Sequence, residues 1–240
     1  MELIKKVVSG LEYLTDACLF LLCLAVFSSG AYAIYDSCMV YSQAKDVSLL
    51  KYKPEYELPM EEEKRSPLEH MVAWLTLEDT PVDFPVMQGK DNMEYLNKDP
   101  YGQYSLAGSI FLDSRNQPDF SDPYSLIYGH HMEHGAMFGA LDRFLDETYF
   151  FAHREGTLTV GEEALKIRTM AVVETGGEEE AVFAPTENDS LTLPFIEEHA
   201  LYRDHSVSMG KQDRLIALST CKYPDTSDRI IVFCVLMPDE

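Results

Sequence analysis

Three side chains have the types and the sequence positions that acyl transfer requires. Cys221 ends an apolar run, and a thiol at the end of a strand would be held rigidly at the rim of a sheet, where substrate can approach. His130 ends a second apolar run, Ser125–Tyr128, after Gly129, and a thiol nucleophile needs a proton carrier beside it. Arg229 follows Cys221 by eight residues and could stabilise an oxyanion if the two strands are neighbours. Together these residue types indicate thiol-dependent acyl transfer.

The cysteines of this chain do not form the pattern of a disulfide framework. Three of the five lie in or just beyond an apolar run near the N-terminus: Cys18, Cys23 and Cys38. Cys234 lies within an apolar stretch and is expected to be a buried structural residue. Cys221 is therefore the predicted working thiol, and the nearby cations Lys222 and Arg229 would favour its thiolate.

Two other interpretations compete with a thiol enzyme. His130, Glu133 and His134 match the His-x-x-Glu-His pattern of a class of zinc proteases, which requires one helix so that both histidines face one side. Gly129 and Gly135 bracket the motif and a predicted strand precedes it, and both features disfavour a helix. The second alternative is a non-enzymatic surface adhesion module with a structural cysteine. We expect neither a metal nor a cofactor.

Short strand-like runs separated by Pro, Gly, Asn and Asp dominate the chain from Leu68 onward. The predicted strands are Met71–Leu77, Phe84–Gln88, Ser109–Leu112, Ser125–Tyr128, Gly156–Val160, Leu165–Glu174, Arg214–Ser219 and Arg229–Leu236. Helical spacing of apolar residues predicts two helices, Met137–Phe151 and Leu193–Arg203. This element content predicts a mostly-β domain built as a closed or nearly closed barrel.

The N-terminal part of the chain is predicted to attach the domain to a membrane. The run Ala17–Tyr35 carries no charge and can just cross the hydrocarbon of a bilayer, and the preceding Lys5 and Lys6 place the N-terminus in the cytoplasm. A cleaved signal peptide is the alternative, because Ala31-Tyr32-Ala33 fits a cleavage site after Ala33. The predicted organisation is a cytoplasmic segment 1–14, a transmembrane anchor 15–36, an extracellular stalk with some helix 37–66, and a folded domain 67–240.

The composition argues against one class of partner. The chain has 240 residues and a formal net charge of -22 at pH 7. Phosphate backbones are bound by clusters of Lys and Arg, so this acidity argues against a nucleic-acid partner.

Several segments, taken together, resemble the class B members of the sortase family. They are Leu218-Ser219-Thr220-Cys221 followed by Arg229, Tyr128-Gly129-His130 followed by Met137-Phe138-Gly139-x-Leu141, and Asp83-Phe84-Pro85-Val86-Met87-Gln88-Gly89 followed by Asp91-Asn92-x-x-Tyr95-Leu96. Ala217 departs from the Thr that is common in the family at that position. The resemblance extends from about Met71 to Leu236 and includes the helix predicted before the Cys221 strand.

This resemblance implies an eight-stranded sortase-type β-barrel with a few peripheral helices and a cysteine transpeptidase activity. Such an enzyme cleaves a C-terminal sorting motif after Thr, holds the acyl group as a thioester on Cys221, and transfers it to an amine of the cell wall or of a pilin Lys. His130 would be the acid–base residue and Arg229 would stabilise the transition state. The resemblance also assigns substrate binding to Asn92, Leu96, Ser219 and Thr220. The implied location is the cell membrane, single-pass, with the catalytic domain outside.

Overall fold

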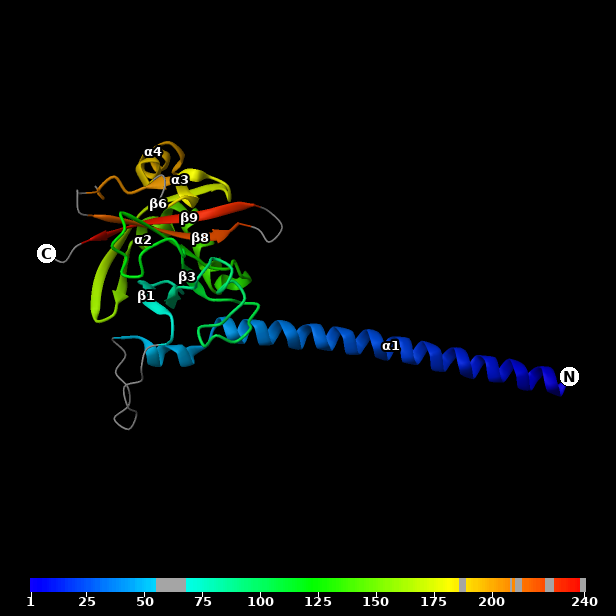
Figure 1. Ribbon diagram of the computed structural model, residues 1–240. Helices are drawn as coiled ribbons and strands as arrows, with labels where there is room; N and C mark the ends of the chain where they lie inside the picture. The colour runs from blue at the N-terminus through cyan, green and yellow to red at the C-terminus, as the bar shows by residue number, and fades with distance from the viewer. Residues whose placement is uncertain (55–67, 186–188, 208, 210–212, 223–226, 238–240) are drawn as a thin grey trace. The chain divides into compact units, whose positions relative to one another are not determined.

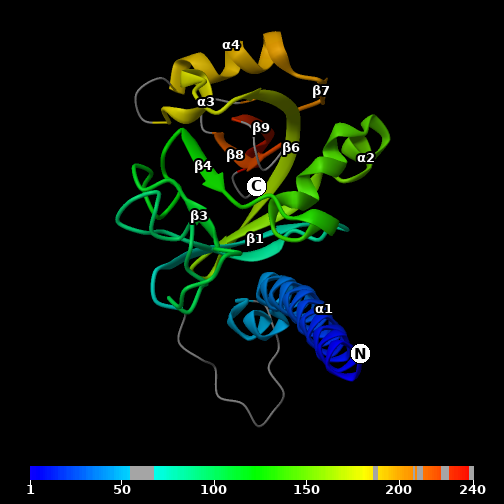
Figure 2. The same cartoon turned by 90° about the vertical axis from the view of Figure 1, so that its right-hand side faces the viewer.

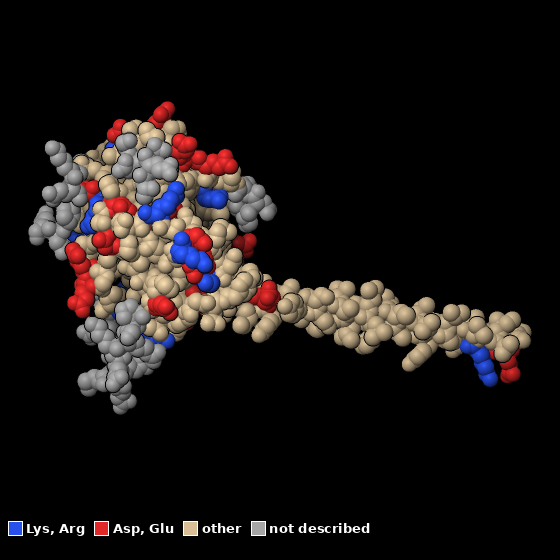
Figure 3. Space-filling view, in the orientation of Figure 1, with Lys and Arg blue, Asp and Glu red and all other residues tan. Residues whose placement is uncertain are grey.

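The structure is a computed structural model that describes residues 1–54, 68–185, 189–207, 209, 213–222 and 227–237 (Figure 1). The chain divides into two units, residues 1–42 and 43–240. The first unit consists of α1 (Glu2–Ala44), which ends two residues inside the second unit. By length and composition α1 can cross a membrane, and most of its visible surface carries no charged side chain (Figure 3).

The second unit is a closed β-barrel. Its strands are β1 (Met71–Leu77), β2 (Asp83–Met87), β3 (Ile110–Leu112), β4 (Tyr124–Tyr128), β5 (Glu155–Val160), β6 (Glu163–Gly176), β7 (Tyr202–Arg203), β8 (Arg214–Cys221) and β9 (Asp228–Met237). They form one sheet in the order β5-β1-β2-β3-β4-β8-β9-β6-β7, and an additional β5–β6 pairing closes it. Eight strands therefore make the barrel and β7 extends it beside β6, so the predicted eight-stranded barrel is confirmed.

The apolar runs that predicted β8 and β9 are buried on both faces. Alternate side chains of β4, β6, β8 and β9 pack against α3 (Glu180–Phe183) and α4 (Asp189–His199). Figure 2 shows these two helices together beside β6 and β9. The opposite side chains face the interior of the barrel, which explains why both strands lack the alternating polar pattern of a half-exposed strand.

The helical predictions were wrong in their extents. The expected helix Met137–Phe151 is instead a 3₁₀ helix, η3 (Phe138–Leu145), followed by α2 (Glu147–Ala152). Asp146 separates them because its backbone is extended and its side chain accepts a hydrogen bond from the Tyr149 N–H as an N-cap. The expected helix Leu193–Arg203 ends earlier, since α4 stops at His199 and the next residues pair with β6 as β7.

The first residues of the second unit pack on the barrel. After α1 the chain forms the short 3₁₀ helix η1 (Val47–Tyr52), whose Leu49 is buried with Trp74 of β1. Lys53 then donates to Asp83 at 2.8 Å, and Trp74 Nε1 donates to the same carboxylate oxygen at 2.7 Å. Part of the segment predicted as a stalk, residues 55–66, lies outside the described residues.

Candidate active site

Pairing in the sheet brings Cys221 and Arg229 together. The two residues are direct partners across the antiparallel β8–β9 pair. Directly opposed residues project from the same face, with Cβ atoms about 5 Å apart. On the other side of Arg229, Thr175 of β6 is its partner. The thiol and the guanidinium therefore lie on one face at one end of the barrel, and both side chains are half-buried.

The parallel pairing of β4 with β8 brings His130 to the same end. Tyr128 is in register with Ser219, and the Gly129 N–H donates to the Ser219 carbonyl at 3.1 Å. His130 therefore follows β4 where Cys221 ends β8. The carboxyl ends of neighbouring parallel strands meet at one edge, so residues distant in sequence are juxtaposed there. The structure thus brings the three residues of the predicted catalytic set to one site.

The backbone carbonyl of Leu96 orients the His130 ring. Nε2 of His130 lies 2.7 Å from this oxygen. A carbonyl oxygen only accepts, so Nε2 carries the proton and Nδ1 of the neutral ring remains a proton acceptor. The close approach depends on Gly108, whose φ is +60°, since a Cβ there would lie 2.6 Å from the Leu96 carbonyl oxygen. Leu96 thus contacts His130 through its backbone carbonyl, and this contact could not be predicted from the type of its side chain.

Lys222 and Thr220 lie on the opposite face from the thiol, because successive side chains of a strand alternate. Lys222 pairs with Glu174 at 2.8 Å, so Arg229 is the cation of the two that shares a face with Cys221. Thr220 is buried, and its hydroxyl donates to the Gly129 carbonyl at 2.9 Å. This bond ties the strand that carries the thiol to the strand that carries His130.

The side chains of Ser219 and Asn92 differ in whether they form hydrogen bonds with neighbouring residues. Ser219 is 2% exposed and lies on the Cys221 face, and its Oγ has no hydrogen-bond partner among the described residues. In contrast, Asn92 donates through Nδ2 to Asp113 and accepts from the Ser114 N–H through Oδ1. Ser219 thus offers a free hydroxyl two residues from the thiol, whereas the Asn92 amide braces the loop after β2.

Cys234 has the surroundings of a structural residue. It is fully buried on β9, with Thr169 Oγ1 at 3.8 Å from its sulfur. Burial raises the pKa of the Cys234 thiol to about 12, which keeps it protonated and unreactive at neutral pH.

The zinc-protease interpretation is not supported. The segment that carries the motif is extended at Met132 and turns through the short 3₁₀ helix η2 (Glu133–Gly135), in which His134 has a φ of +58°. No cluster of three or more His, Cys, Asp or Glu residues suited to a metal ion occurs among the described residues. His130 and His134 therefore do not share the face of a helix.

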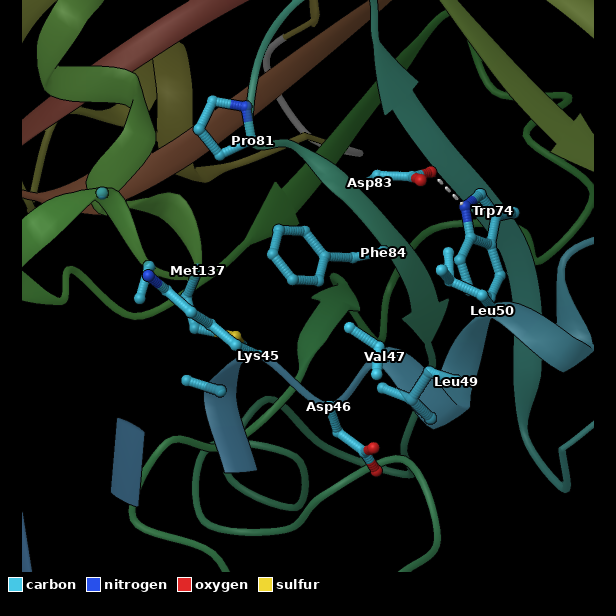
Figure 4. A pocket seen from close by; sticks show the side chains of 13 residues that line it. Lys45, Asp46, Val47, Leu49, Leu50, Trp74, Pro81, Asp83, Phe84 and Met137 are labelled. Atoms are coloured by element: carbon cyan, nitrogen blue, oxygen red, sulfur yellow. Dashed lines mark hydrogen bonds between the residues drawn. The ribbon is translucent and has the colours of Figure 1, made fainter. Parts of the chain in front are cut away.

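A cavity of about 280 Å³ is bordered by Gly135–Met137, in the segment that follows His130 (Figure 4). Its walls are mainly apolar and come from the start of the second unit, the β1–β2 hairpin and Gly135–Met137. Neither Cys221, His130 nor Arg229 lines it. This cavity is therefore separate from the site formed by the three residues.

Comparison with known proteins identifies the family. The family model described as a Sortase domain matches residues 75–237. Sortase B of Listeria monocytogenes is 37% identical over 154 residues, which cover 63% of this chain and 62% of that protein, less than two thirds of its length.

Two solved structures share the fold. Spy0129, a Streptococcus pyogenes class B sortase involved in pilus biogenesis, matches with a TM-score of 0.64 and 36% identity over 70% of this chain and 92% of the other. Sortase B from B. anthracis in complex with AAEK1 matches with a TM-score of 0.69 and 29% identity over 84% and 99%. Because the family match covers nearly the whole barrel and the solved structures that share it are class B sortases, the chain belongs to the sortase family as a member of class B.

Proposed function

We propose that this protein is a cysteine transpeptidase that joins proteins bearing a C-terminal sorting motif to an amine. The observation that carries the proposal is the convergence of Cys221, His130 and Arg229 at one end of three adjacent strands. A nucleophile, a proton carrier and a fixed cation are the groups that acyl transfer through a thioester requires. Family membership independently supports the same chemistry.

The first half-reaction breaks the peptide bond after the Thr of the motif. Nδ1 of His130 takes the proton of the Cys221 thiol, the resulting thiolate attacks the Thr carbonyl carbon, and the guanidinium of Arg229 stabilises the oxyanion that forms. The C–N bond then breaks, and His130 donates a proton to the leaving amine. The product is an acyl-thioester on Cys221 together with the released C-terminal fragment.

The second half-reaction resolves the thioester. An acceptor amine attacks the thioester carbonyl, His130 takes the amine proton, and the C–S bond breaks to regenerate the thiolate. Nδ1 of His130 is the nitrogen available for these proton transfers, since Nε2 donates to Leu96. The acceptor is an amine of the cell wall or a pilin Lys, and the acyl donors are secreted surface proteins or pilins.

The substrate is proposed to bind beside Asn92, Leu96, Ser219 and Thr220. Ser219 has the strongest support of the four, because a buried hydroxyl without a partner among the described residues can bond to a peptide group that replaces water. Thr220 and Asn92 act through the backbone segments that they brace. The helix α1 is proposed to anchor the enzyme in the cell membrane with its barrel outside.

Trapping of the acyl-enzyme tests the proposed function. The detergent-solubilised chain is incubated with a set of sorting peptides, and intact mass reports an adduct that hydroxylamine removes. Cys221→Ala should abolish the adduct, whereas Cys234→Ala should form it and lose only stability. An adduct on Cys221→Ala would refute the role of this thiol. Absence of an adduct on the unsubstituted chain, together with surface binding that alkylation of Cys221 leaves unchanged, would favour the adhesion module. Inhibition of peptide cleavage by a metal chelator would favour zinc hydrolysis.

A further inference from the structure

A buried carboxylate beside the active site collects donors from three segments. The Asp113 side chain is 0% exposed and lies just after β3. It accepts from Asn92 Nδ2 at 2.8 Å, from the Tyr128 hydroxyl at 2.9 Å, and from Arg115 through Nε at 2.9 Å and Nη2 at 2.8 Å. Burial by itself would raise the pKa of Asp113, but the donors from Arg115 and Tyr128 lower it overall, so the group is an anion at neutral pH.

Arg115 extends this cluster to the helix α3. Its Nη2 also donates to the Phe183 carbonyl at 2.7 Å. The Phe183 ring in turn stacks on the Tyr128 ring, with 6.5 Å between centroids and an interplanar angle of 11°. Asp113, Tyr128, Phe183 and Arg115 thus form a closed cycle of contacts, which we call the Arg115 clamp.

The Arg115 clamp holds one end of the segment Gly177–Phe183, which borders the proposed catalytic residues. Tyr128 pairs in register with Ser219, so its ring projects from the face that carries Cys221. At the other end of the segment, a Cβ on Gly177 would lie 3.4 Å from the guanidinium carbon of Arg229. The segment from Gly177 to Phe183 therefore begins beside Arg229 and ends over Tyr128, along the edge of this face.

We propose that Arg115 is a positioning residue that fixes α3 against Tyr128 and thereby sets the width of the peptide-binding surface next to Ser219 and Cys221. The inference rests on the proposed transpeptidase function. An arginine suits this role because its planar fork can donate to the Asp113 carboxylate and the Phe183 carbonyl at once, which an ammonium does less well. The hydrogen bonds of the Arg115 side chain among the described residues go to Asp113 and Phe183 and not to Cys221, so its loss should weaken peptide binding and leave the chemical step intact.

Steady-state kinetics of Arg115→Ala give the first test. We expect KM for a sorting peptide to rise about tenfold, the size of one charge-assisted hydrogen bond, with kcat within about threefold of the unsubstituted protein. Arg115→Lys should recover the thermal stability that Arg115→Ala loses, but it should keep most of the increase in KM. Combination with Phe183→Ala should raise KM by less than the product of the two single effects, because both residues act through α3.

The matched control is Arg154→Ala. Arg154 also pairs with a buried carboxylate, Asp204, but near Met170, well along β6 from Gly176. We expect this variant to lose thermal stability with an unchanged KM. An unchanged KM in Arg115→Ala, or an equal rise in Arg154→Ala, would overturn the proposal.

Amide hydrogen exchange without peptide separates this inference from the proposed function. Exchange at Val182, Phe183 and Ala184 should be at least about tenfold faster in Arg115→Ala and unchanged in Arg154→Ala. If the unsubstituted protein forms no acyl-enzyme, the proposed function fails while exchange still decides whether Arg115 holds α3. Exchange that Arg115→Ala leaves unaltered would refute the clamp, whatever the peptide activity.

Discussion

Two adjacent histidines follow the end of β4, and their Nε2 atoms have different hydrogen-bond partners. His130 Nε2 donates to the Leu96 carbonyl, whereas His131 Nε2 lies 2.8 Å from the Asp142 carboxylate on η3. We predict that His130→Ala loses nearly all turnover, because no other group on the thiol face is proposed to carry the proton. His131→Ala should retain most turnover and lose stability. The reverse pattern in steady-state rates would show that the assignment is wrong by one residue.

The substitution Arg229→Lys distinguishes a general effect of positive charge from an effect of directed hydrogen bonds. A guanidinium holds several donors in a rigid fork, whereas Lys presents a mobile point charge. We predict that Arg229→Lys loses at least about a hundredfold in kcat/KM for a sorting peptide, a typical cost of losing an oxyanion donor. Circular dichroism should show an intact fold, because Arg229 lies near the start of β9 and is half-buried. Activity within about tenfold of the unsubstituted protein would leave only a field effect of the charge.

The members of the proposed catalytic set could be selected from the sequence because each of them ends, follows or begins an apolar run. Their juxtaposition depends on a β4–β8 pairing between residues more than eighty positions apart, and the resemblance to a family supplied it. The Leu96 carbonyl could not be predicted, because any residue has a carbonyl. Asp113 gave a usable signal, a carboxylate directly after a buried strand, but its donors come from three separate segments.

At the scale of elements, the loop that carries Leu96 depends on glycine near His130. In Gly108→Ala the new Cβ would meet the Leu96 carbonyl oxygen at 2.6 Å and His130 Cδ2 at 3.0 Å. We predict that this variant loses stability and at least about tenfold in kcat, because the ring loses its oriented partner.

Gly102→Ala is the matched control for this variant. Gly102 also has a positive φ, of +80°, and its Cβ would meet nothing within 4 Å. This variant should show the cost of backbone strain in thermal unfolding and keep its kcat. Equal kcat values in Gly102→Ala and Gly108→Ala would contradict a role for the Leu96 contact.

The strands were easier to predict than the helices for a physical reason. Strand runs such as Met71–Leu77 are bounded by turn residues and matched the structure closely. The apolar spacing from Met137 to Phe151 fits one helix, yet η3 has i to i+3 bonds and Asp146 caps a new helix. Periodicity reports which side chains face the core and does not distinguish one helix from two short ones that share that face.

At the scale of the whole molecule, three partly or fully buried carboxylates link stability to pH. Burial would raise the pKa values of Asp83, Asp113 and Asp204, but hydrogen bonds, from Lys53, Arg115 and Ser206 respectively among others, lower each below the ordinary 3.8. A carboxylate whose pKa is lower in the folded state than in the unfolded state stabilises the fold fully at pH values above its unfolded-state pKa. It loses this contribution as the pH falls through its folded-state pKa. These groups should therefore keep Tm constant from pH 7 to about 5 and lower it steeply below about 4.

Asp83→Asn tests the linkage in a thermal scan across this pH range. The variant should have a lower Tm at pH 7 and a shallower decline below pH 4. Glu162→Gln, at an exposed turn, is the control and should follow the unsubstituted curve. A decline that is equally steep in Asp83→Asn would mean that other groups dominate acid unfolding.

The net charge of -22 and the apolar α1 predict where the protein is found. Acidic side chains are spread over the visible face of the second unit with Lys and Arg among them (Figure 3), which suits an aqueous surface. We predict that the full-length chain stays in the membrane fraction at its full mass after salt washing, because an apolar helix of this length is retained by hydrocarbon. A mature N-terminus at Ile34, detected by sequencing, would show cleavage after Ala33 and a secreted protein.

The strand order has a consequence for how the chain reaches its native state during synthesis. Among the described strands, β8 and β9 come last along the chain, yet they lie between β4 and β6 in the sheet. Until β8 has emerged β4 presents an unpaired edge, and until β9 has emerged β6 presents another; such edges are templates for aggregation. Such long-range pairing is slow, and the barrel cannot close before both β8 and β9 have been made. Cys221, the proposed nucleophile, is the last residue of β8, so a chain that ends before it lacks both the thiol and a closed barrel.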